Sequence, residues 1–447
     1  MFRKVLVANR GEIAVRIIRA CHELDISTVA VYSEADRESL HVHMADEAVC
    51  IGPAVPARSY LNIPALISAA KVTASEAIHP GYGFLAENAY FAKMCTTYGI
   101  TFIGPTSRTI ELAGNKIEAR HIASQVGVPV IPGTEFPLVD EYQVKEAVKQ
   151  LGLPVIIKAS AGGGGRGMRV VHTSEEIMDI VARAQTEAEN AFGRKDVYLE
   201  KYIEEPRHIE FQLLADSFGQ VIHLGERDCS VQRRHQKLIE EAPCPVLTSE
   251  MRQEIGELSV KLGKAINLRS AATVEYLMDK TGNFYFIEIN PRIQVEHGIT
   301  EFVTGIDLVR EQIRLAAGER LELKQEDISW VGCAMECRIN AEDPDHDFRP
   351  SPGSLKNYLA PGGPGVRVDS VACPGYNIPF HYDSMIAKVI VHARTRPEAI
   401  NRMKRSLKEM VVDGVKTTIP FHLRVLSNAF FIQGEVNTNF VQRRLGE

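Results

Sequence analysis

The sequence predicts three regions: an α/β N-terminal domain with a parallel sheet, an α+β region with a glycine-rich lid, and an antiparallel C-terminal domain. Three observations predict this organisation. Strands and helices alternate over the first hundred residues, a glycine-rich loop joins two short strands in the middle of the chain, and polar–apolar alternation begins near Arg207. The length of 447 residues agrees with about three domains of roughly 150 residues each.

Composition and charge exclude several classes of protein. There are 51 Lys and Arg against 57 Asp and Glu, so the net charge is −6 and nothing draws the chain generally to nucleic acid or anionic membranes. No apolar run approaches the roughly 18 residues that span a bilayer, and the start offers no signal-peptide core. The eight cysteines form no CxxC pair, which favours reduced thiols in a cytoplasmic protein.

The N-terminal domain is predicted over residues 1–114. Its strands are expected at Lys4–Ala8, Thr28–Tyr32, Glu47–Ile51, Ala77–His79 and Ile100–Ile103, and its helices at Glu12–Leu24, Ile63–Lys71 and Ala89–Tyr98. Such alternation is typical of a parallel sheet wound on both faces. The first turn, Ala8–Glu12, lacks the GxGxxG of a dinucleotide site, which counts against a nicotinamide oxidoreductase.

The second region is predicted over residues 115–330 and includes a mobile lid at about 131–203. A single long helix, Ser107–Val126, leads into it and ends before Gly127. The lid is expected to contain strands Pro154–Ala159, Met168–Val171 and Val197–Tyr202, with a helix from Ser174 to about Glu189. A module of about 70 residues is long enough to move independently.

Antiparallel strands follow the lid. Arg207–Ala215 alternates His208, Glu210 and Gln212 with apolar residues, which indicates one polar face. Further elements are expected at Val221–Gly225, Ser249–Ile266, Ala272–Met278, Asn283–Asn290 and Asp307–Ala317. Several strands and a helix at Arg396–Met410 then make up the C-terminal domain, residues 331–447.

A glycine cluster between two strands is the strongest local motif. Lys158 on the first strand precedes Gly162, Gly163, Gly164, Gly165, Arg166 and Gly167. Glycines let a loop present backbone N–H groups to phosphate oxygens. A flexible hairpin tip is the alternative, but the nearby lysine and arginine favour phosphate. GxxxxGK[ST] is absent, so the motif predicts a flap over a nucleotide rather than a P-loop.

Two carboxylates are predicted to face each other. If Thr281-Gly282 is a two-residue hairpin loop, Glu275 lies opposite Glu288, and Asn290 shares the face of Glu288. Like charges so placed repel unless a cation lies between them, and hard oxygen ligands favour Mg²⁺ or Mn²⁺. The alternative is a pair of carboxylates on a solvated sheet face.

Two charged runs accompany these carboxylates. In residues 290–297, Arg292 can hold an oxyanion and Glu296 can act as a base. Residues 226–237 are dense in charge, and by themselves would be interpreted as a solvated basic loop. His208 alone would more often be a satisfied polar strand residue than a ligand contact.

Taken together, these motifs resemble the biotin carboxylase family of the ATP-grasp superfamily, in family order over almost the whole chain. The matching segments are KVLVANRGEIAVRIIRA (4–20), HPGYGFLAEN (79–88), PVIIKASAGGGGRGM (154–168), LEKYI (199–203), ERDCSVQRRHQK (226–237), FIEINPRIQVEH (286–297), RINAED (338–343) and YDSMIAK (382–388). The resemblance implies an ATP-grasp lid in the second region and an ATP-dependent ligase that carboxylates biotin with bicarbonate.

The resemblance also implies residue roles. ATP binding is implied for Lys116, Lys158, Gly162, Gly163, Gly164, Gly165, Arg166, Gly167, Glu200, Lys201, Ile203, His208, Gln232, His235, Glu275 and Glu288. Mg²⁺ or Mn²⁺ is implied at Glu275, Glu288 and Asn290. The bicarbonate pocket is implied at Lys237, Arg292, Gln294, Val295 and Glu296, with Lys237, Arg292 and Glu296 catalytic. The biotin side is implied at Tyr82 and Arg338. For Arg338, the alternative is a surface ion pair with Glu342 or Asp343.

The chemistry implied by the resemblance needs these residue types. Glu296 would take the proton of bicarbonate, and Lys237 and Arg292 would stabilise charge during attack on the γ-phosphoryl group. The resulting carboxyphosphate must be kept from water and gives CO₂ and phosphate. Phosphate can then deprotonate biotin, whose enolate Arg338 is suited to stabilise. Two departures from the family, Gly298 and Asn115, are expected to affect rate, and Gly298 to loosen the catalytic strand end.

The implied partners lie outside this sequence. The biotin-accepting motif Ala-Met-Lys-Met is absent, so biotin is expected on a separate carrier protein and carboxyl transfer on carboxyltransferase subunits. The resemblance implies a cytoplasmic homodimer that performs the first half-reaction of acetyl-CoA carboxylase, in fatty acid biosynthesis and lipid metabolism. A component of a two-subunit pyruvate carboxylase or of another acyl-CoA carboxylase is the alternative. A different ATP-grasp ligase or a non-catalytic nucleotide-binding regulator are rival interpretations.

Overall fold

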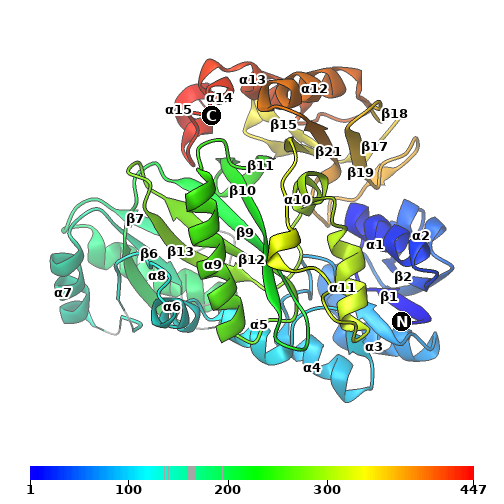
Figure 1. Ribbon diagram of the computed structural model, residues 1–447, viewed down its shortest axis with the longest axis horizontal. Coiled ribbons are helices and arrows are strands. Elements are labelled where there is room, and N and C mark those ends of the chain that lie inside the picture. The colour runs from blue at the N-terminus through cyan, green and yellow to red at the C-terminus, as the bar shows by residue number, and fades with distance from the viewer. Residues whose placement is uncertain (135, 139, 160–167, 194, 447) are drawn as a thin grey trace.

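The computed structural model describes residues 1–134, 136–138, 140–159, 168–193 and 195–446 (Figure 1). Residues 160–167, which include the predicted glycine flap, lie outside the described residues. Figure 1 shows the N-terminal elements α1, α2, β1 and β2 at one end and α7, β6 and β7 at the other, with a large sheet between them. In the part of the chain that is described, no helix combines the length and the apolar character needed to cross a bilayer.

The N-terminal sheet is parallel throughout, in the order β3-β2-β1-β4-β5. Its elements are β1 Lys4–Val7, α1 Gly11–Glu23, β2 Ser27–Ser33, α2 Leu40–Met44, β3 Glu47–Gly52, α3 Ile63–Val72, β4 Ala77–His79, α4 Ala89–Thr97 and β5 Thr101–Phe102. Val5 and Val7 belong to the same core as Ile13 of α1, and Leu6 to the core that includes Leu66 of α3. Helices therefore cover both faces of the sheet, and the predicted doubly wound sheet is confirmed.

The predicted helix over 107–126 is two helices. α5 spans Ser107–Gly114 and α6 spans Lys116–Gln125. Asn115 separates them with an extended backbone, and its side chain accepts a hydrogen bond from the backbone N–H of Glu118. The single-helix prediction was wrong because an asparagine in the helical pattern is a good N-cap and starts a new helix. The break places Lys116 at the first position of α6.

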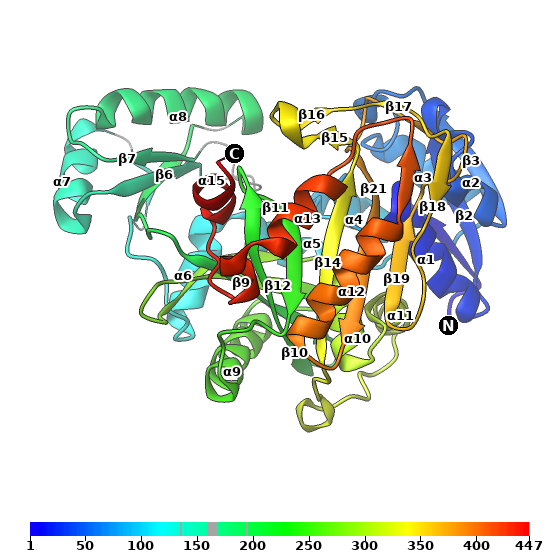
Figure 2. The same ribbon diagram turned by 90° about the horizontal axis from the view of Figure 1, so that it is seen from above.

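A small antiparallel sheet in the order β7-β6-β8 forms the lid region. Its elements are α7 Glu141–Leu151, β6 Val155–Ala159, β7 Arg169–Val171, α8 Ile177–Phe192 and β8 Val197–Lys201. Figure 2 shows β6 and β7 beside α8 at one end of the molecule, separate from the large sheet. Its own hydrophobic core includes Val155, Ile157 and Leu199. The sequence did not predict α7, which Asp140 caps.

An antiparallel sheet of eight strands forms the centre of the molecule, in the order β13-β12-β9-β10-β11-β14-β21-β19. The strands are β9 Arg207–Ala215, β10 Val221–Arg233, β11 Gln236–Ala242, β12 Ser270–Met278, β13 Phe284–Asn290, β14 Cys333–Asn340, β19 Val366–Ser370 and β21 Met385–Ala393. Pairing of β11 with β14 carries the sheet across the predicted boundary at residues 330–331. The antiparallel C-terminal strands are therefore a continuation of the central sheet.

The charged run 226–237 by itself would be interpreted as a solvated basic loop, and that interpretation is wrong. Glu226–Arg233 continues β10, and Gln236 and Lys237 begin β11. The two turn residues, Arg234 and His235, have φ of 49° and 66°. Most of the run is buried because its charges find partners inside the sheet.

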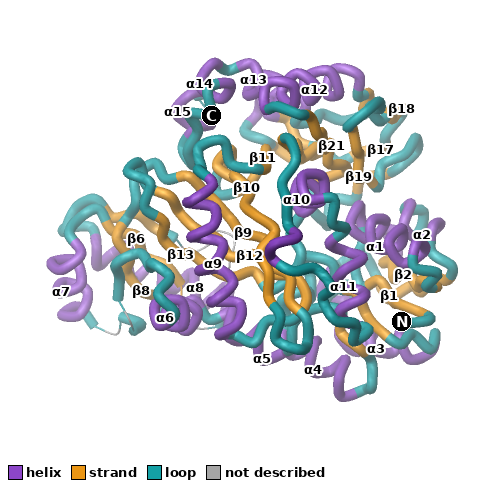
Figure 3. The backbone as a smooth tube through the Cα atoms, in the orientation of Figure 1, coloured by secondary structure: helices purple, strands orange, loops and turns teal. Residues whose placement is uncertain are grey.

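Helices pack around the sheet, and in the described C-terminal part the short strands form separate two-stranded sheets (Figure 3). The remaining helices are α9 Ser249–Ala265, α10 His297–Thr304, α11 Leu308–Ala316, α12 Arg396–Glu409, α13 Ile419–Ser427, α14 Ala429–Ile432 and α15 Phe440–Leu445. The short strands are β15 Glu342–Asp343, β16 Arg349–Pro350, β17 Gly353–Ser354, β18 Asn357–Leu359, β20 Asn377–Ile378 and β22 Val411–Asp413. They pair as β15-β16, β17-β20 and β18-β22.

The chain has a helix, α10, where the sequence predicted the end of a catalytic strand. β13 ends at Asn290 and α10 begins at His297, so Gly298 is its second residue. A Cβ atom on Gly298 would come within 2.4 Å of Cδ1 of Ile390 on β21. The glycine thus allows α10 to approach β21 closely, and the expected loosening of a strand end does not describe this position.

Candidate active site

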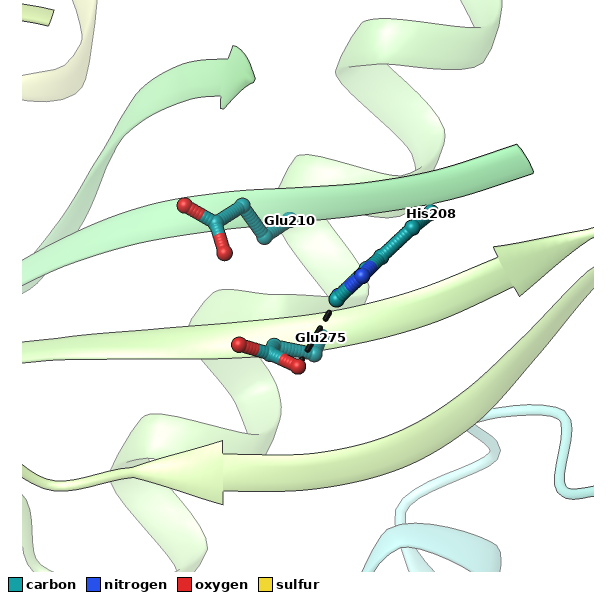
Figure 4. A group of neighbouring side chains, drawn as sticks. All are labelled: His208, Glu210 and Glu275. Atoms are coloured by element: carbon teal, nitrogen blue, oxygen red, sulfur yellow. Dashed lines mark hydrogen bonds and ion pairs between the residues drawn. The ribbon is translucent and has the colours of Figure 1, made fainter. Parts of the chain in front are cut away.

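Two neighbouring strands of the central sheet bring acidic and basic side chains to one face. Figure 4 shows His208 and Glu210 on β9 and Glu275 on β12 pointing to the same side. Nε2 of His208 lies 2.9 Å from Oε2 of Glu275. Ligand atoms of the three residues all lie within 4.8 Å of one another. The strands therefore build a buried acidic surface, as the alternation over 207–215 indicated.

The predicted pairing of Glu275 with Glu288 is confirmed, although its premise was wrong. The hairpin closes through Asp279 and Asn283, so its loop has three residues rather than two. That loop would shift the register by one residue. A β-bulge between Glu275 and Tyr276 restores the predicted pairing at the carboxylates.

The carboxylates and the amide at this hairpin are held by cationic neighbours. Nζ of Lys116 lies 3.2 Å from Oε2 of Glu288. Nδ2 of Asn290 donates to Oε1 of Glu275 at 3.0 Å and to Oε1 of Glu288 at 3.5 Å. Burial alone would raise the pKa of Glu275, but Lys237 and His208 hold that pKa below its ordinary value. The two carboxylates fit the hard oxygen ligands that Mg²⁺ prefers, whereas Asn290 turns its Nδ2 toward them and its Oδ1 toward Arg292.

Lys237 and Arg338 hold Glu296 from two sides. Nζ of Lys237 donates to Oε1 of Glu296 at 2.8 Å, to Oε2 of Glu210 at 2.6 Å and to Oε1 of Glu275 at 3.0 Å. Nη2 of Arg338 donates to Oε2 of Glu296 at 3.0 Å. Burial of Glu296 opposes its ionisation, but these cations hold its pKa well below the ordinary value. Glu296 is therefore an ionised carboxylate whose side chain is fully buried.

Arg338 is not a surface residue. Only 14% of its side chain is exposed, and Nε donates to Oε1 of Glu240 at 2.7 Å. The alternative partners proposed for it are occupied elsewhere: Glu342 accepts from Ser384, and Asp343 from the N–H of Asp345. The surface ion pair is therefore wrong.

The remaining predicted bicarbonate residues surround Glu296. Nη1 of Arg292 donates to Oε1 of Gln294 at 2.7 Å, and its Nη2 donates to Oδ1 of Asn290 at 3.2 Å. Nε2 of Gln294 lies 3.4 Å from Oε1 of Glu275. The carbonyl of Val295 accepts a hydrogen bond from the buried ammonium group of Lys388.

The predicted nucleotide residues are divided between the lid and the central sheet. Nζ of Lys158 on β6 donates to Oε2 of Glu200 on β8 at 2.5 Å, and both side chains are buried. Lys201 instead donates to the carbonyls of Gly152 and Leu153 at 3.0 Å. Ile203 is half-buried in the segment after β8.

Two more predicted nucleotide residues lie at the β10–β11 turn. Gln232 is buried and pairs with Lys237 across the two strands. His235 is at the exposed tip of the turn. On the predicted biotin side, the hydroxyl of Tyr82 donates to Oε1 of Glu12 on α1.

Sequence reasoning assigned no role to several residues that build this site. Arg227 is fully buried and donates to Glu210, to Oε1 of Gln212 at 2.8 Å and to Oγ1 of Thr300 at 2.9 Å. The alternation of β9 already placed Glu210 beside His208, so that signal was present. Others, such as Glu240, depend on contacts between strands far apart in sequence.

Three family matches cover most of the chain. Residues 1–110 match "Biotin carboxylase, N-terminal domain", and residues 336–443 match "Biotin carboxylase C-terminal domain". Residues 115–324 match "Carbamoyl-phosphate synthase L chain, ATP binding domain".

Curated relatives and solved structures are similar over the full length. The chain is 57% identical over 441 residues to biotin carboxylase of Nostoc sp., covering 99% of both chains. It is 54% identical over 441 residues to one of the subunits of pyruvate carboxylase from Methanothermobacter thermautotrophicus, covering 99% of this chain and 90% of that one. The biotin carboxylase domain dimer of Hydrogenobacter thermophilus 2-oxoglutarate carboxylase, solved with MgADP, ADP and bicarbonate, superposes with a TM-score of 0.97 at 51% identity, covering 100% and 98%.

Proposed function

This chain belongs to the biotin carboxylase family and is an enzyme that carboxylates biotin using ATP; we propose that it performs the first half-reaction of acetyl-CoA carboxylase, with biotin presented on a separate carrier protein. One observation carries the assignment of the chemistry. Glu296 lies between Lys237, which also contacts the metal-side carboxylate Glu275, and Arg338, which faces the other way toward β11. A single base thus connects the phosphate side of the site with the biotin side.

In this proposal Glu296 removes the proton of bicarbonate. Its carboxylate is ionised at neutral pH because Lys237 and Arg338 hold its pKa well below the ordinary value. When Lys237 turns toward the transferring phosphoryl group, Glu296 loses one cation and its pKa rises, so it becomes a stronger base at the moment the proton must move. The oxygen of bicarbonate then attacks the γ-phosphorus of ATP, the bond to ADP breaks, and carboxyphosphate forms.

Arg292 and the two residues after it would orient bicarbonate. The Arg292 guanidinium donates to Gln294 and Asn290, and its Nε lies 3.0 Å from Oε2 of Glu87. An oxyanion would replace one of these partners on a planar fork suited to it. Glu275, Glu288 and Asn290 would hold Mg²⁺, or Mn²⁺, which neutralises charge on the phosphates when bound. Lys116, Lys158, Glu200, Lys201, Ile203, His208, Gln232, His235 and the glycine flap would bind ATP, as the family resemblance implies.

Tyr82 and Arg338 would receive biotin. Carboxyphosphate breaks down to CO₂ and phosphate, phosphate takes the ureido proton of biotin, and the nitrogen attacks CO₂ to form a C–N bond. Arg338 would turn from Glu296 to the enolate oxygen, for which a guanidinium is suited. Both of its present partners are carboxylates, so the enolate would replace one of them as the anionic partner of Arg338.

We infer a division into domains 1–114, 115–330 and 331–447, with a lid over about 131–203 that closes on the nucleotide. The separate core of the lid sheet supports the lid as a unit, whereas the central sheet continues across the boundary at 330–331. We further infer a cytoplasmic homodimer that works with a biotin carboxyl carrier protein and carboxyltransferase subunits in fatty acid biosynthesis. The dimer formed by the Hydrogenobacter biotin carboxylase domain supports the assembly.

The proposal also specifies which molecule finally receives the carboxyl group. Relatives named for pyruvate carboxylase and 2-oxoglutarate carboxylase are nearly as similar as the Nostoc biotin carboxylase, so a component of a two-subunit pyruvate carboxylase is the second candidate. The higher identity to the Nostoc protein, over 99% of its length, favours the acetyl-CoA carboxylase assignment.

Two measurements test the proposal. Release of ADP that depends on bicarbonate and increases with free biotin is expected, and its absence would refute biotin carboxylation. The tagged chain is then purified with its partners, and transfer of ¹⁴C-carboxyl to acetyl-CoA, pyruvate and 2-oxoglutarate is compared. Transfer to acetyl-CoA is expected, whereas exclusive transfer to either keto acid would reject the acetyl-CoA assignment.

A further inference from the structure

Two carboxylates behind Arg338 face each other across neighbouring strands. Glu240 on β11 and Glu336 on β14 are directly opposed in the register, and neither has any solvent exposure. Directly opposed residues have Cβ atoms about 4.5–5.5 Å apart. Two ionised carboxylates this close and away from water repel strongly, so one of them retains a proton at neutral pH.

The hydrogen-bond partners locate that proton. Oε1 of Glu240 accepts from Nε of Arg338 at 2.7 Å. Oε2 of Glu240 and both carboxylate oxygens of Glu336 are buried and have no hydrogen-bond partner among the described residues. A proton on Glu336 turns one of its oxygens into a donor, and the free Oε2 of Glu240 is an acceptor within side-chain reach. One proton therefore satisfies two of the three unpartnered oxygens.

Charged and titratable groups face this pair from every packed element. They are Arg338 and Cys337 on β14, Lys237 on β11, Cys229 on β10, Lys388 on β21, Tyr82 after β4, and Glu296 just before α10. Burial raises the pKa of Glu336 well above its ordinary value, with Lys388 opposing the rise. Burial also raises the pKa of Glu240 to about 7, with Arg338 opposing. The cation that most opposes the rise in pKa is thus Arg338 for Glu240 and Lys388 for Glu336.

We propose that Glu240 and Glu336 share one proton and act as positioning residues that control how tightly Arg338 is held. With the proton on Glu336, ionised Glu240 keeps Arg338 against Glu296, where Nη2 and Oε2 are 3.0 Å apart. Transfer of the proton breaks the O–H bond on Glu336 and forms one on Glu240. The charge of the pair stays at −1 but moves toward Lys388, and Arg338 is released toward biotin. This inference rests on the proposed function.

Glu336→Gln tests the shared proton with little change of shape. Its amide can donate to Glu240, but it has no proton to transfer, so Arg338 stays held. The turnover number with biotin is expected to fall about tenfold, while the KM for ATP and the biotin-independent, bicarbonate-dependent ATP hydrolysis remain within about twofold. The pH profile of biotin-dependent turnover should lose an ionisation near neutral pH that the wild-type protein shows.

Glu241→Gln is the matched control. Glu241 is the next residue on β11, is also buried, and accepts from Nε of Arg396 at 2.6 Å on the other face of the sheet. The Glu241→Gln variant is expected to have lower thermal stability. The ratio of biotin-dependent turnover to biotin-independent ATP hydrolysis, and the pH profile, should be unchanged. An unchanged pH profile in Glu336→Gln, or an equal loss of both activities, would overturn the proposal.

Infrared spectroscopy separates this inference from the proposed function. The wild-type protein should show the C=O band of a buried carboxylic acid at neutral pH, and Glu336→Gln should remove it. A band that is absent from the wild-type protein refutes the shared proton, whatever the reaction. Absence of biotin-dependent turnover in the wild-type protein would instead refute the proposed function, even if the band is present.

Discussion

The two ends of the active-site face neutralise their carboxylates in different ways. At the β12–β13 end, the side chain of Glu288 is 18% exposed and that of its partner Lys116 is 12% exposed. At the β11–β14 end, Glu240 and Glu336 have no exposure. An ion pair in contact with water can exchange its partner for a ligand, because water compensates both charges during the exchange. A buried carboxylate must be balanced inside the protein, by a fixed cation or by a proton.

This difference matches what each end has to do. In the proposed function, the partly exposed end releases an ammonium group and accepts a metal ion and phosphates in every cycle. In the proposal above, the buried end moves charge between Glu240 and Glu336, and Arg338 leaves Glu296 for biotin. Substitutions that act on only one end test this difference between the two ends.

The largest effect is expected from Glu288→Gln at the exposed end. The variant keeps its shape but loses one charge of the proposed metal clamp, so kcat/KM for MgATP should fall about 1,000-fold, several kcal/mol of charge stabilisation. Thermal stability should hardly change, because the side chain is partly exposed. Steady-state kinetics over a range of Mg²⁺ concentrations provide the measurement. Wild-type constants at limiting Mg²⁺ would show that Glu288 is not a ligand.

A smaller and more selective loss is expected from Arg338→Ala at the buried end. Biotin-dependent carboxylation should fall about 100-fold with an unchanged KM for ATP, because one donor to the developing enolate is removed. Arg338→Lys should restore only part of the rate, since an ammonium group cannot reproduce the planar fork. Both activities are measured in one preparation. Equal loss of biotin-dependent carboxylation and biotin-independent ATP hydrolysis would contradict a role at biotin.

The smallest effect concerns stability at acid pH. His422 is fully buried, its Nε2 lies 2.6 Å from the carbonyl of Arg338, and burial lowers its pKa to about 4. An unfolded histidine has a pKa of about 6.5. Between these values the unfolded chain binds a proton that the folded chain does not, so the free energy of unfolding decreases as the pH falls.

His422→Gln should therefore reduce the difference in unfolding free energy between pH 7 and pH 5.5 by about 1 kcal/mol. Urea denaturation at the two pH values measures it. His43→Gln, at an exposed position, is the control and should leave the difference unchanged. A variant at 422 with the full wild-type pH dependence would show that this histidine is not the titrating group.

Local patterns predicted most of the elements, and errors arose where tertiary contacts decide. The alternation over the first hundred residues gave the parallel sheet because its inner strands, such as β1 and β4, are buried by neighbouring helices. The charged run 226–237 was misjudged because its partners lie on other strands, such as Glu210 for Arg227. The split at Asn115 is a local capping effect that the helical periodicity concealed.

The site was predicted unevenly for the same reason. Glu275 and Glu288 belong to one hairpin, so their pairing followed from sequence, although a three-residue loop and a bulge had to offset each other. Glu240 and Glu336 are almost a hundred residues apart, and their pairing depends on β11 meeting β14. No single-sequence pattern contains that contact. The roles of the individual residues remain predictions.

The continuous sheet has a consequence for dividing this protein into parts. β11 and β14 exchange backbone hydrogen bonds across the predicted boundary near residue 330. A fragment that ended there would leave the N–H and C=O groups of β11 as a bare edge strand, with Glu240 beside it in water. Such an edge is a template for pairing with other chains. A truncated fragment is therefore expected to aggregate. The strands on both sides of residue 330 should be expressed together as one uninterrupted chain.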